Sequence, residues 1–144
     1  MTDLLKPFIV LLKMEIINNE FLDTITQLAK ENPRLRMNYN LHTSLDAKAQ
    51  RLLNALEPGT VLPIHRHLST AETYILLRGK IEINFYNNQK KVTETIELDP
   101  FKNNYGIQIP AGQWHSLKVL ESSSVLFEVK DGPYTPITPE NILE

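Results

Sequence analysis

Residues 59–79 read GTVLPIHRHLSTAETYILLRG, and this stretch decides the fold class. Between its two flanking glycines lie runs rich in β-branched and apolar residues, which predict strands at Val61–His67 and Glu72–Arg78. Successive side chains of a strand point to opposite faces, so His65 and His67 should point the same way. The stretch therefore predicts two consecutive strands, the first of which presents two imidazoles on one face.

The histidines of this stretch form part of a predicted metal site. Glu72 begins the second strand and can reach the same ion across a short connection, and His115 follows the Pro110–Gly112 turn at the head of a later strand. Imidazole and carboxylate suit Zn, Fe(II), Mn, Co, Ni or Cu and leave room for water or substrate. We therefore predict one divalent transition metal ion bound by His65, His67, Glu72 and His115. The chain has no cysteine, which excludes a thiolate nucleophile, a Cys-based zinc site, an iron–sulfur cluster and disulfides.

Outward from this stretch, alternating apolar residues and regularly spaced turn residues predict an all-β sandwich or barrel. Further strands are expected at Arg36–Leu41, Gln50–Leu56, Lys80–Tyr86, Val92–Leu98, Tyr105–Ile109, Trp114–Leu120 and Ser124–Lys130. One amphipathic helix is predicted over about residues 19–31, capped by Asn18 or Asn19. The proline-rich tail at residues 131–139 predicts extended chain on the surface.

Length and charge limit the function further. The 144 residues match a single domain, and we expect an N-terminal extension at 1–15 and one domain at 16–144 with its barrel at about 36–130. Fifteen Lys and Arg against seventeen Asp and Glu leave a net charge of −2, which argues against nucleic-acid and membrane partners. The early apolar run, Phe8–Leu12, is too short to span a bilayer, which predicts a cytoplasmic protein. The apolar residues before Met14 need a partner, which is the domain body or a second subunit.

Polar residues on predicted strands are candidates for a substrate pocket. Arg36 suits a carboxylate or phosphate, whereas Asn38 and Asn40 suit hydroxyl groups, but this strand face either lines a pocket or meets solvent. Tyr74 shares the face of Glu72 and is a candidate pocket wall or core residue. Gln113, beside His115, completes the candidate set. His42 is predicted to be structural or exposed, Trp114 to pack, and Arg51 and Glu128 to form either an ion pair or a polar cavity wall.

The motifs resemble the cupin superfamily. Its first motif is glycine, five residues, His-x-His, three or four residues, Glu, six residues and glycine, and residues 59–79 carry every anchor. Its second motif is matched by Pro110-Ala-Gly-Gln-Trp-His115, with Asn104 in place of a glycine and Val119 in place of an asparagine. Asn tolerates the left-handed conformation that glycine favours. The resemblance implies a double-stranded β-helix, or jelly-roll barrel, with the helix outside and the metal inside one end.

Flanking segments also resemble the WbuC-type cupin metalloproteins found with genes of bacterial surface-polysaccharide biosynthesis. The similar stretches are residues 33–42, 50–59, 109–115 and 127–134. This resemblance implies an enzyme that acts by metal-assisted chemistry on a small polar molecule, such as a sugar or nucleotide-sugar intermediate. The alternatives are a non-haem iron dioxygenase and a non-catalytic, metal-bearing sugar-binding or sensor module. Small cupins are commonly dimers, so a homodimer is expected.

Overall fold

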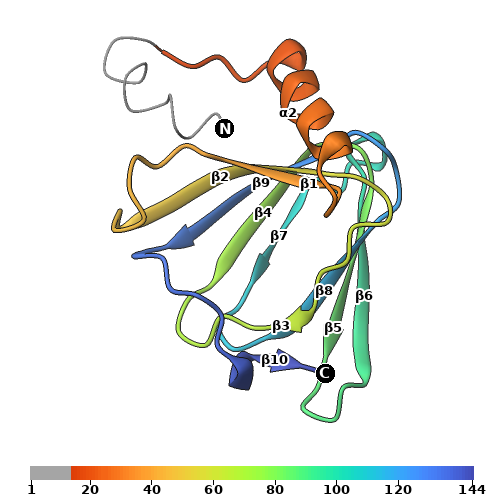
Figure 1. Cartoon of the computed structure of the whole chain (residues 1–144). Coiled ribbons are helices and arrows are strands. Elements are labelled where there is room, and N and C mark those ends of the chain that lie inside the picture. Colours follow the sequence, from red (N-terminus) through yellow and green to blue (C-terminus); the bar gives the residue numbers. More distant parts are fainter. Residues whose placement is uncertain (1–13) are drawn as a thin grey trace.

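The computed structural model describes residues 14–144 as two facing antiparallel sheets with one helix outside them (Figure 1). One five-stranded sheet has the order β1 (Arg36–Asn40), β2 (Ala49–Leu56), β9 (Ser124–Asp131), β4 (Glu72–Arg78) and β7 (Gly106–Ile109). The other has the order β10 (Ile142–Leu143), β3 (Ile64–His65), β8 (Trp114–Val119), β5 (Ile81–Tyr86) and β6 (Val92–Leu98). This arrangement confirms the predicted mainly-β jelly roll.

The main core lies between the sheets because apolar residues alternate along the strands. On β5, for example, Ile81, Ile83 and Phe85 are buried, and the residues between them are less so. Their neighbours in the core include Leu56, Leu76, Leu98, Leu117 and Leu126. Each such side chain contributes about 1.5–3 kcal/mol when it is fully buried. Apolar packing therefore fills one part of the space between the sheets, and polar side chains are left to line the remainder.

Helix α2 (Asn19–Glu31) covers the outer face of β1, β2 and β9. The Asn18 side chain accepts a hydrogen bond from the Phe21 amide at 2.9 Å, which caps the helix as the sequence predicts. The buried helix residues Ile25 and Ala29 pack on Leu53 in a second core. Residues of β1 and β2 that alternate with those packed on α2 must point to the other side of the sheet, toward the opposite sheet.

Two local predictions need correction, and the end of the chain adds elements that the sequence did not predict. The strand predicted at Val61–His67 shortens to β3, because Pro63 lacks an amide hydrogen and the Arg66 amide donates to Asn141 O instead. Beyond the predicted extended tail, a 3-10 helix at Pro139–Asn141 leads into β10, which pairs with β3. Asn103, rather than Asn104, takes the left-handed conformation with φ 61°, after the 3-10 helix at Pro100–Lys102. Residues 1–13 of the expected N-terminal extension at 1–15 lie outside the described residues.

In the described part of the chain, none of the helices has both the length and the apolar character needed to span a bilayer.

Candidate metal centre

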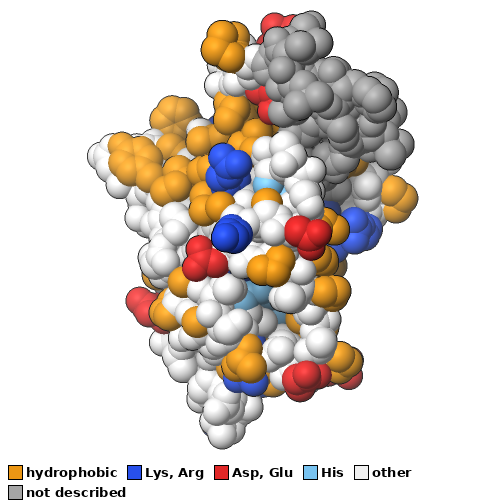
Figure 2. Space-filling view, turned by 90° about the vertical axis from the view of Figure 1, so that its left-hand side faces the viewer, with side chains coloured by type: hydrophobic (Ala, Val, Ile, Leu, Met, Phe, Trp, Pro, Cys, Tyr) orange, Lys and Arg blue, Asp and Glu red, His pale blue; other side chains and the backbone are white. Residues whose placement is uncertain are grey.

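A cavity of about 440 Å³ lies between the sheets, beside the apolar core. The inner faces of β1, β2, β9 and β4 form one wall, and residues of β3 and β8 form the opposite wall. Histidine side chains are visible among acidic, basic and apolar groups on the face shown in Figure 2. Three of the histidines that line the cavity are those of the predicted metal site, His65, His67 and His115.

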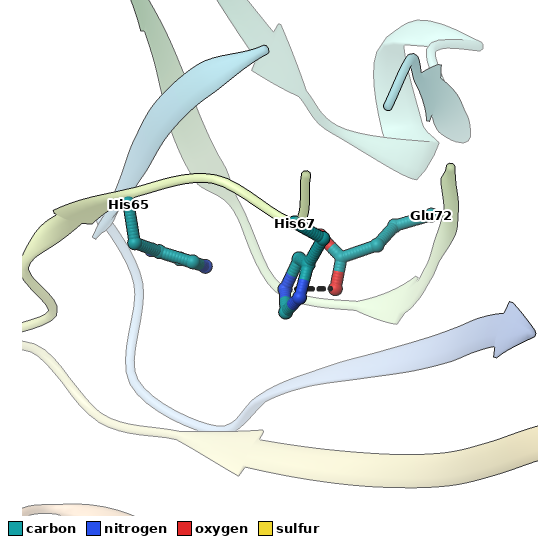
Figure 3. Close-up of side chains that lie close together, drawn as sticks. All are labelled: His65, His67 and Glu72. Atoms are coloured by element: carbon teal, nitrogen blue, oxygen red, sulfur yellow. Dashed lines mark ion pairs between the residues drawn. The ribbon is translucent and has the colours of Figure 1, made fainter. Parts of the chain in front are cut away.

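Short strands bring the predicted ligands together. Strand β3 carries His65, the segment after it carries His67, and β4 begins at Glu72, so the three side chains point toward one another (Figure 3). Each offers a ligand atom within 4.8 Å of those of the other two. His115 lies outside this mutual group, but it pairs with His65 in the β3–β8 register, and its Nε2 is 3.2 Å from Glu72 Oε2.

Main-chain carbonyls orient two of the imidazoles. His65 Nδ1 lies 3.0 Å from Pro63 O, and His115 Nδ1 lies 2.9 Å from Gln113 O. A carbonyl only accepts hydrogen bonds, so both Nδ1 atoms carry a proton, and in the neutral form of each ring the Nε2 atom presents a lone pair. Metal-binding histidines in proteins are commonly oriented by this kind of bond.

The His115 Nε2 atom gives the strongest indication of a cation. It is buried and makes no hydrogen bond to any residue in 14–144, although the Glu72 carboxylate oxygen is 3.2 Å away. A lone pair facing a carboxylate oxygen is unfavourable unless a proton or a cation lies between them. The other Glu72 oxygen lies 3.0 Å from His67 Nε2. The donor set therefore fits a divalent transition metal ion held by imidazole nitrogens and carboxylate oxygens.

Electrostatics keep these groups in their ligand forms. Burial, together with His115, lowers the pKa of His65 to about 4, so this imidazole is neutral at pH 7. Burial raises the pKa of Glu72, but ring protons of His115 and His67 directed at its oxygens outweigh burial and hold the pKa well below its usual range, and a bound cation would take the place of those protons. A neutral imidazole and an ionised carboxylate are the forms that bind a metal without first losing a proton.

Two further ionisable groups face the cavity beside Glu72. The Tyr74 hydroxyl donates to Glu72 Oε2 at 3.2 Å, and burial raises the pKa of Tyr74 well above 10. Glu128 is opposite Tyr74 in the β4–β9 register. Burial, then the charge of Glu72, raises the pKa of Glu128 to about 8, against smaller opposing effects of Lys130 and Asn54. At pH 7 Glu128 is therefore largely a neutral acid that can give up a proton.

The candidate substrate residues divide into two sets. Asn38, Asn40 and Tyr74 line the cavity. Arg36 and Gln113 do not, because Arg36 Nη1 donates to Val61 O at 2.8 Å and Gln113 Nε2 donates to the carbonyls of Tyr86 and Trp114.

The structure also shows where the remaining residues singled out from the sequence lie relative to the cavity. Trp114 is buried under the Arg66 guanidinium, which lies 4.3 Å from its ring, as expected for a packing residue. Arg51 is exposed, and Glu128 takes the cavity-wall position. His42, which shares the even-numbered face of Asn38 and Asn40 and was predicted to be structural or exposed, also lines the cavity.

Comparison with known proteins identifies a family and a fold. A family described as "Domain of unknown function (DUF6016)" matches residues 17–98. No curated protein gave a significant match.

Several solved structures are similar. The protein TT1209 from Thermus thermophilus has 23% identity and a TM-score of 0.58, over 82% of this chain and 97% of that one. The cupin domain of Schizosaccharomyces pombe Cnp3 has 14% identity and a TM-score of 0.54, over 67% of this chain and 64% of that one. Bacillus subtilis oxalate decarboxylase, described for its Mn(II) centres, has 14% identity and a TM-score of 0.54, over 76% and 27%. The chain thus spans less than two thirds of two of these proteins, and the fold it shares with them is the cupin fold.

Proposed function

The chain belongs to the DUF6016 family, and from its cupin fold and its cluster of histidines and glutamate we propose that it is a metal-dependent enzyme acting on a small polar molecule. The proposed ligands are His65, His67, Glu72 and His115, and the cofactor is one divalent transition metal ion. The observation that carries the proposal is the buried Nε2 of His115, which faces Glu72 without a hydrogen bond while its Nδ1 is fixed by Gln113 O.

When bound, a metal ion at this position polarises a substrate oxygen or lowers the pKa of a bound water. The chain's own groups would then divide the remaining work. The carbonyls of Pro63 and Gln113 hold the two imidazoles in their ligand tautomer, and Tyr74 orients the Glu72 carboxylate through its hydroxyl. Glu128 supplies the acid or base that Glu72, as a ligand, cannot supply. Isomerisation, epimerisation and hydrolysis can all use this combination.

We assign the substrate class from the lining. Asn38 and Asn40 offer amide groups that suit hydroxyls, and the cavity is large enough for a sugar-sized molecule. The WbuC-type resemblance of the flanking segments adds the finer proposal of a sugar or nucleotide-sugar intermediate of bacterial surface-polysaccharide biosynthesis, handled in the cytoplasm by a homodimer.

Elemental analysis of protein purified without added metal tests the proposal. About one equivalent of a transition metal is expected in the parent, and its loss is expected in the double variant His65→Ala, His115→Ala. His42→Asn is the matched control, because it removes a cavity histidine outside the cluster and should leave the metal content unchanged. A parent that holds no metal, even after reconstitution, would overturn the metal site and the chemistry built on it.

The same protein samples distinguish the alternatives. Iron in the parent together with oxygen consumption would favour a non-haem iron dioxygenase, since the same ligand types can serve Fe(II). Saturable sugar binding without turnover of any sugar tested would favour a binding or sensor module. Turnover with zinc would exclude the oxygenase.

A further inference from the structure

His42 is buried in the cavity wall with one ring nitrogen bonded and the other unpaired. Only 5% of the residue is exposed. Its Nδ1 lies 3.0 Å from the Arg51 amide nitrogen and 2.9 Å from the Arg51 carbonyl oxygen, so the main chain satisfies this atom in either tautomer. Its Nε2 is buried and has no hydrogen-bond partner within residues 14–144. Proteins rarely keep a buried polar atom unpaired unless a ligand or water meets it.

Asn54 repeats this pattern deeper in the cavity. It is 7% exposed and lines the cavity, and its amide is close enough to the Glu128 carboxyl to lower the pKa of that group. Its Oδ1 is buried and has no partner in the part of the chain described. Turning the amide would exchange its two polar atoms, so one of them is left without a partner among the described residues in either orientation of this cavity-lining residue.

The sheet register places the two unpaired groups on one wall. Asn54 pairs with Asn38 across β1 and β2 and lies three residues along the strand from Arg51, whose main chain holds His42. This separation corresponds to about 10 Å of strand. The Gln50–Lys130–Glu72 row crosses β2, β9 and β4, so the β2 residue before Arg51 lies in the same row as Glu72. His42 therefore lies on the metal side of the wall, and Asn54 lies nearer to the apolar core.

We propose that His42 and Asn54 form a binding subsite for the hydroxyl groups of a neutral, polyhydroxylated molecule. The inference rests on the proposed function in one respect, that the same molecule reaches the metal centre. A hydroxyl group both donates and accepts, so it can pair with the Asn54 amide and with His42 Nε2 in either tautomer. The Asn54 amide carries no charge, so a hydroxyl group is a better match for it than an anionic group.

Matched substitutions separate this role from a structural one. His42→Asn keeps an atom at the Nδ1 position for the Arg51 main chain and lacks Nε2, whereas His42→Gln places an amide near the Nε2 position. Asn54→Leu removes the unpaired amide from this cavity-lining position. Its control is Asn84→Leu, since Asn84 bonds Glu82 and Thr95 away from the cavity. Thermal melting of each variant establishes that it folds.

Binding of a set of neutral mono- and disaccharides is then measured by NMR titration, on metal-loaded and on metal-free protein, with the corresponding sugar acids in parallel. We expect a neutral sugar to bind the parent, and His42→Asn and Asn54→Leu to weaken that binding about tenfold, the effect of losing one hydrogen bond. His42→Gln should recover part of the loss, and Asn84→Leu should have no effect.

The outcomes distinguish this inference from the proposed function. Metal content is measured on the same samples, and a parent without metal overturns the metal proposal, whereas sugar binding still tests the subsite. Failure of every neutral sugar to bind, binding of the sugar acids alone, or equal binding by parent, His42→Asn and Asn54→Leu would each overturn the subsite.

Discussion

Glu128→Gln should change how the stability of the metal-free protein depends on pH. A glutamate whose pKa is raised from 4.5 to about 8 keeps its proton in the folded state after the unfolded chain has lost it. Its stabilising contribution is therefore complete below pH 4.5 and is lost as pH rises through 8. Glutamine resembles the protonated acid and cannot ionise, so the stability of the variant should not decrease for this reason as pH rises.

The window from pH 6.5 to 8 isolates Glu128 from its neighbours. His65, with its pKa lowered from 6.5 to about 4, is neutral in the folded state across this window and at least half neutral in the unfolded state, so it opposes Glu128 only slightly there. Between pH 4 and 6.5 it adds stability as pH rises and opposes Glu128 more strongly. Glu72 is ionised in both states, and Tyr74 is protonated in both. One unmatched proton changes the free energy of unfolding by about 1.4 kcal/mol per pH unit, so the parent should lose at most about 2 kcal/mol across the window.

Urea denaturation of chelator-treated protein at half-unit steps of pH measures this loss. The free energy of unfolding of the parent is expected to fall steadily with pH, and that of Glu128→Gln is expected to stay constant. The control Glu94→Gln, at an exposed strand position, should follow the parent. The argument that Glu128 is a partly buried neutral acid would be refuted if the free energy of unfolding of the parent stayed constant from pH 6.5 to 8, or if that of Glu128→Gln fell as steeply as that of the parent.

Three more predictions follow from the site and the packing. Metal at 100 times its Kd should stabilise the parent by about 2.7 kcal/mol, which a chelator should reverse in thermal melts, and the double variant His65→Ala, His115→Ala should show no such change. Ile25→Ala, which empties a buried position beneath α2, should lower the free energy of unfolding by about 2–5 kcal/mol in urea, whereas the same change at exposed Ile16 should have little effect. Light scattering should give the mass of a homodimer, and a monomer mass at all concentrations tested would contradict that expectation.

The sequence predicted the elements whose signals are local. Alternation and turn residues identified the strands, and the Asn18 cap with its following apolar spacing identified α2. The His-x-His spacing placed His65 and His67 on one side, and Glu72 followed at a distance that a short connection can close. Each of these signals depends on residues close together in the chain, where geometry leaves few alternatives.

Other features depend on contacts between distant segments and had no local signal. Alternation puts Asn38, Asn40 and His42 on one face of the strand, but packing of α2 on the opposite face decides that they point inward. The shortness of β3 follows from Pro63 and from its pairing with β10, which no local pattern indicates. The acid character of Glu128 likewise arises from burial beside Glu72 on another strand.

The pairing of β3 with β10 has a consequence for the order in which the protein assembles. The hydrogen bond from Arg66 to Asn141 joins residues 75 positions apart, so the strand that carries His65 gains its outer neighbour only after a long loop has closed. Strand β10 pairs with β3 through only two residues, and segments with so few contacts are the first to open in the native state. The amide hydrogens of β3 should therefore exchange with solvent faster than those of β4 or β9. A metal ion bound by both His65 on β3 and Glu72 would slow this local opening.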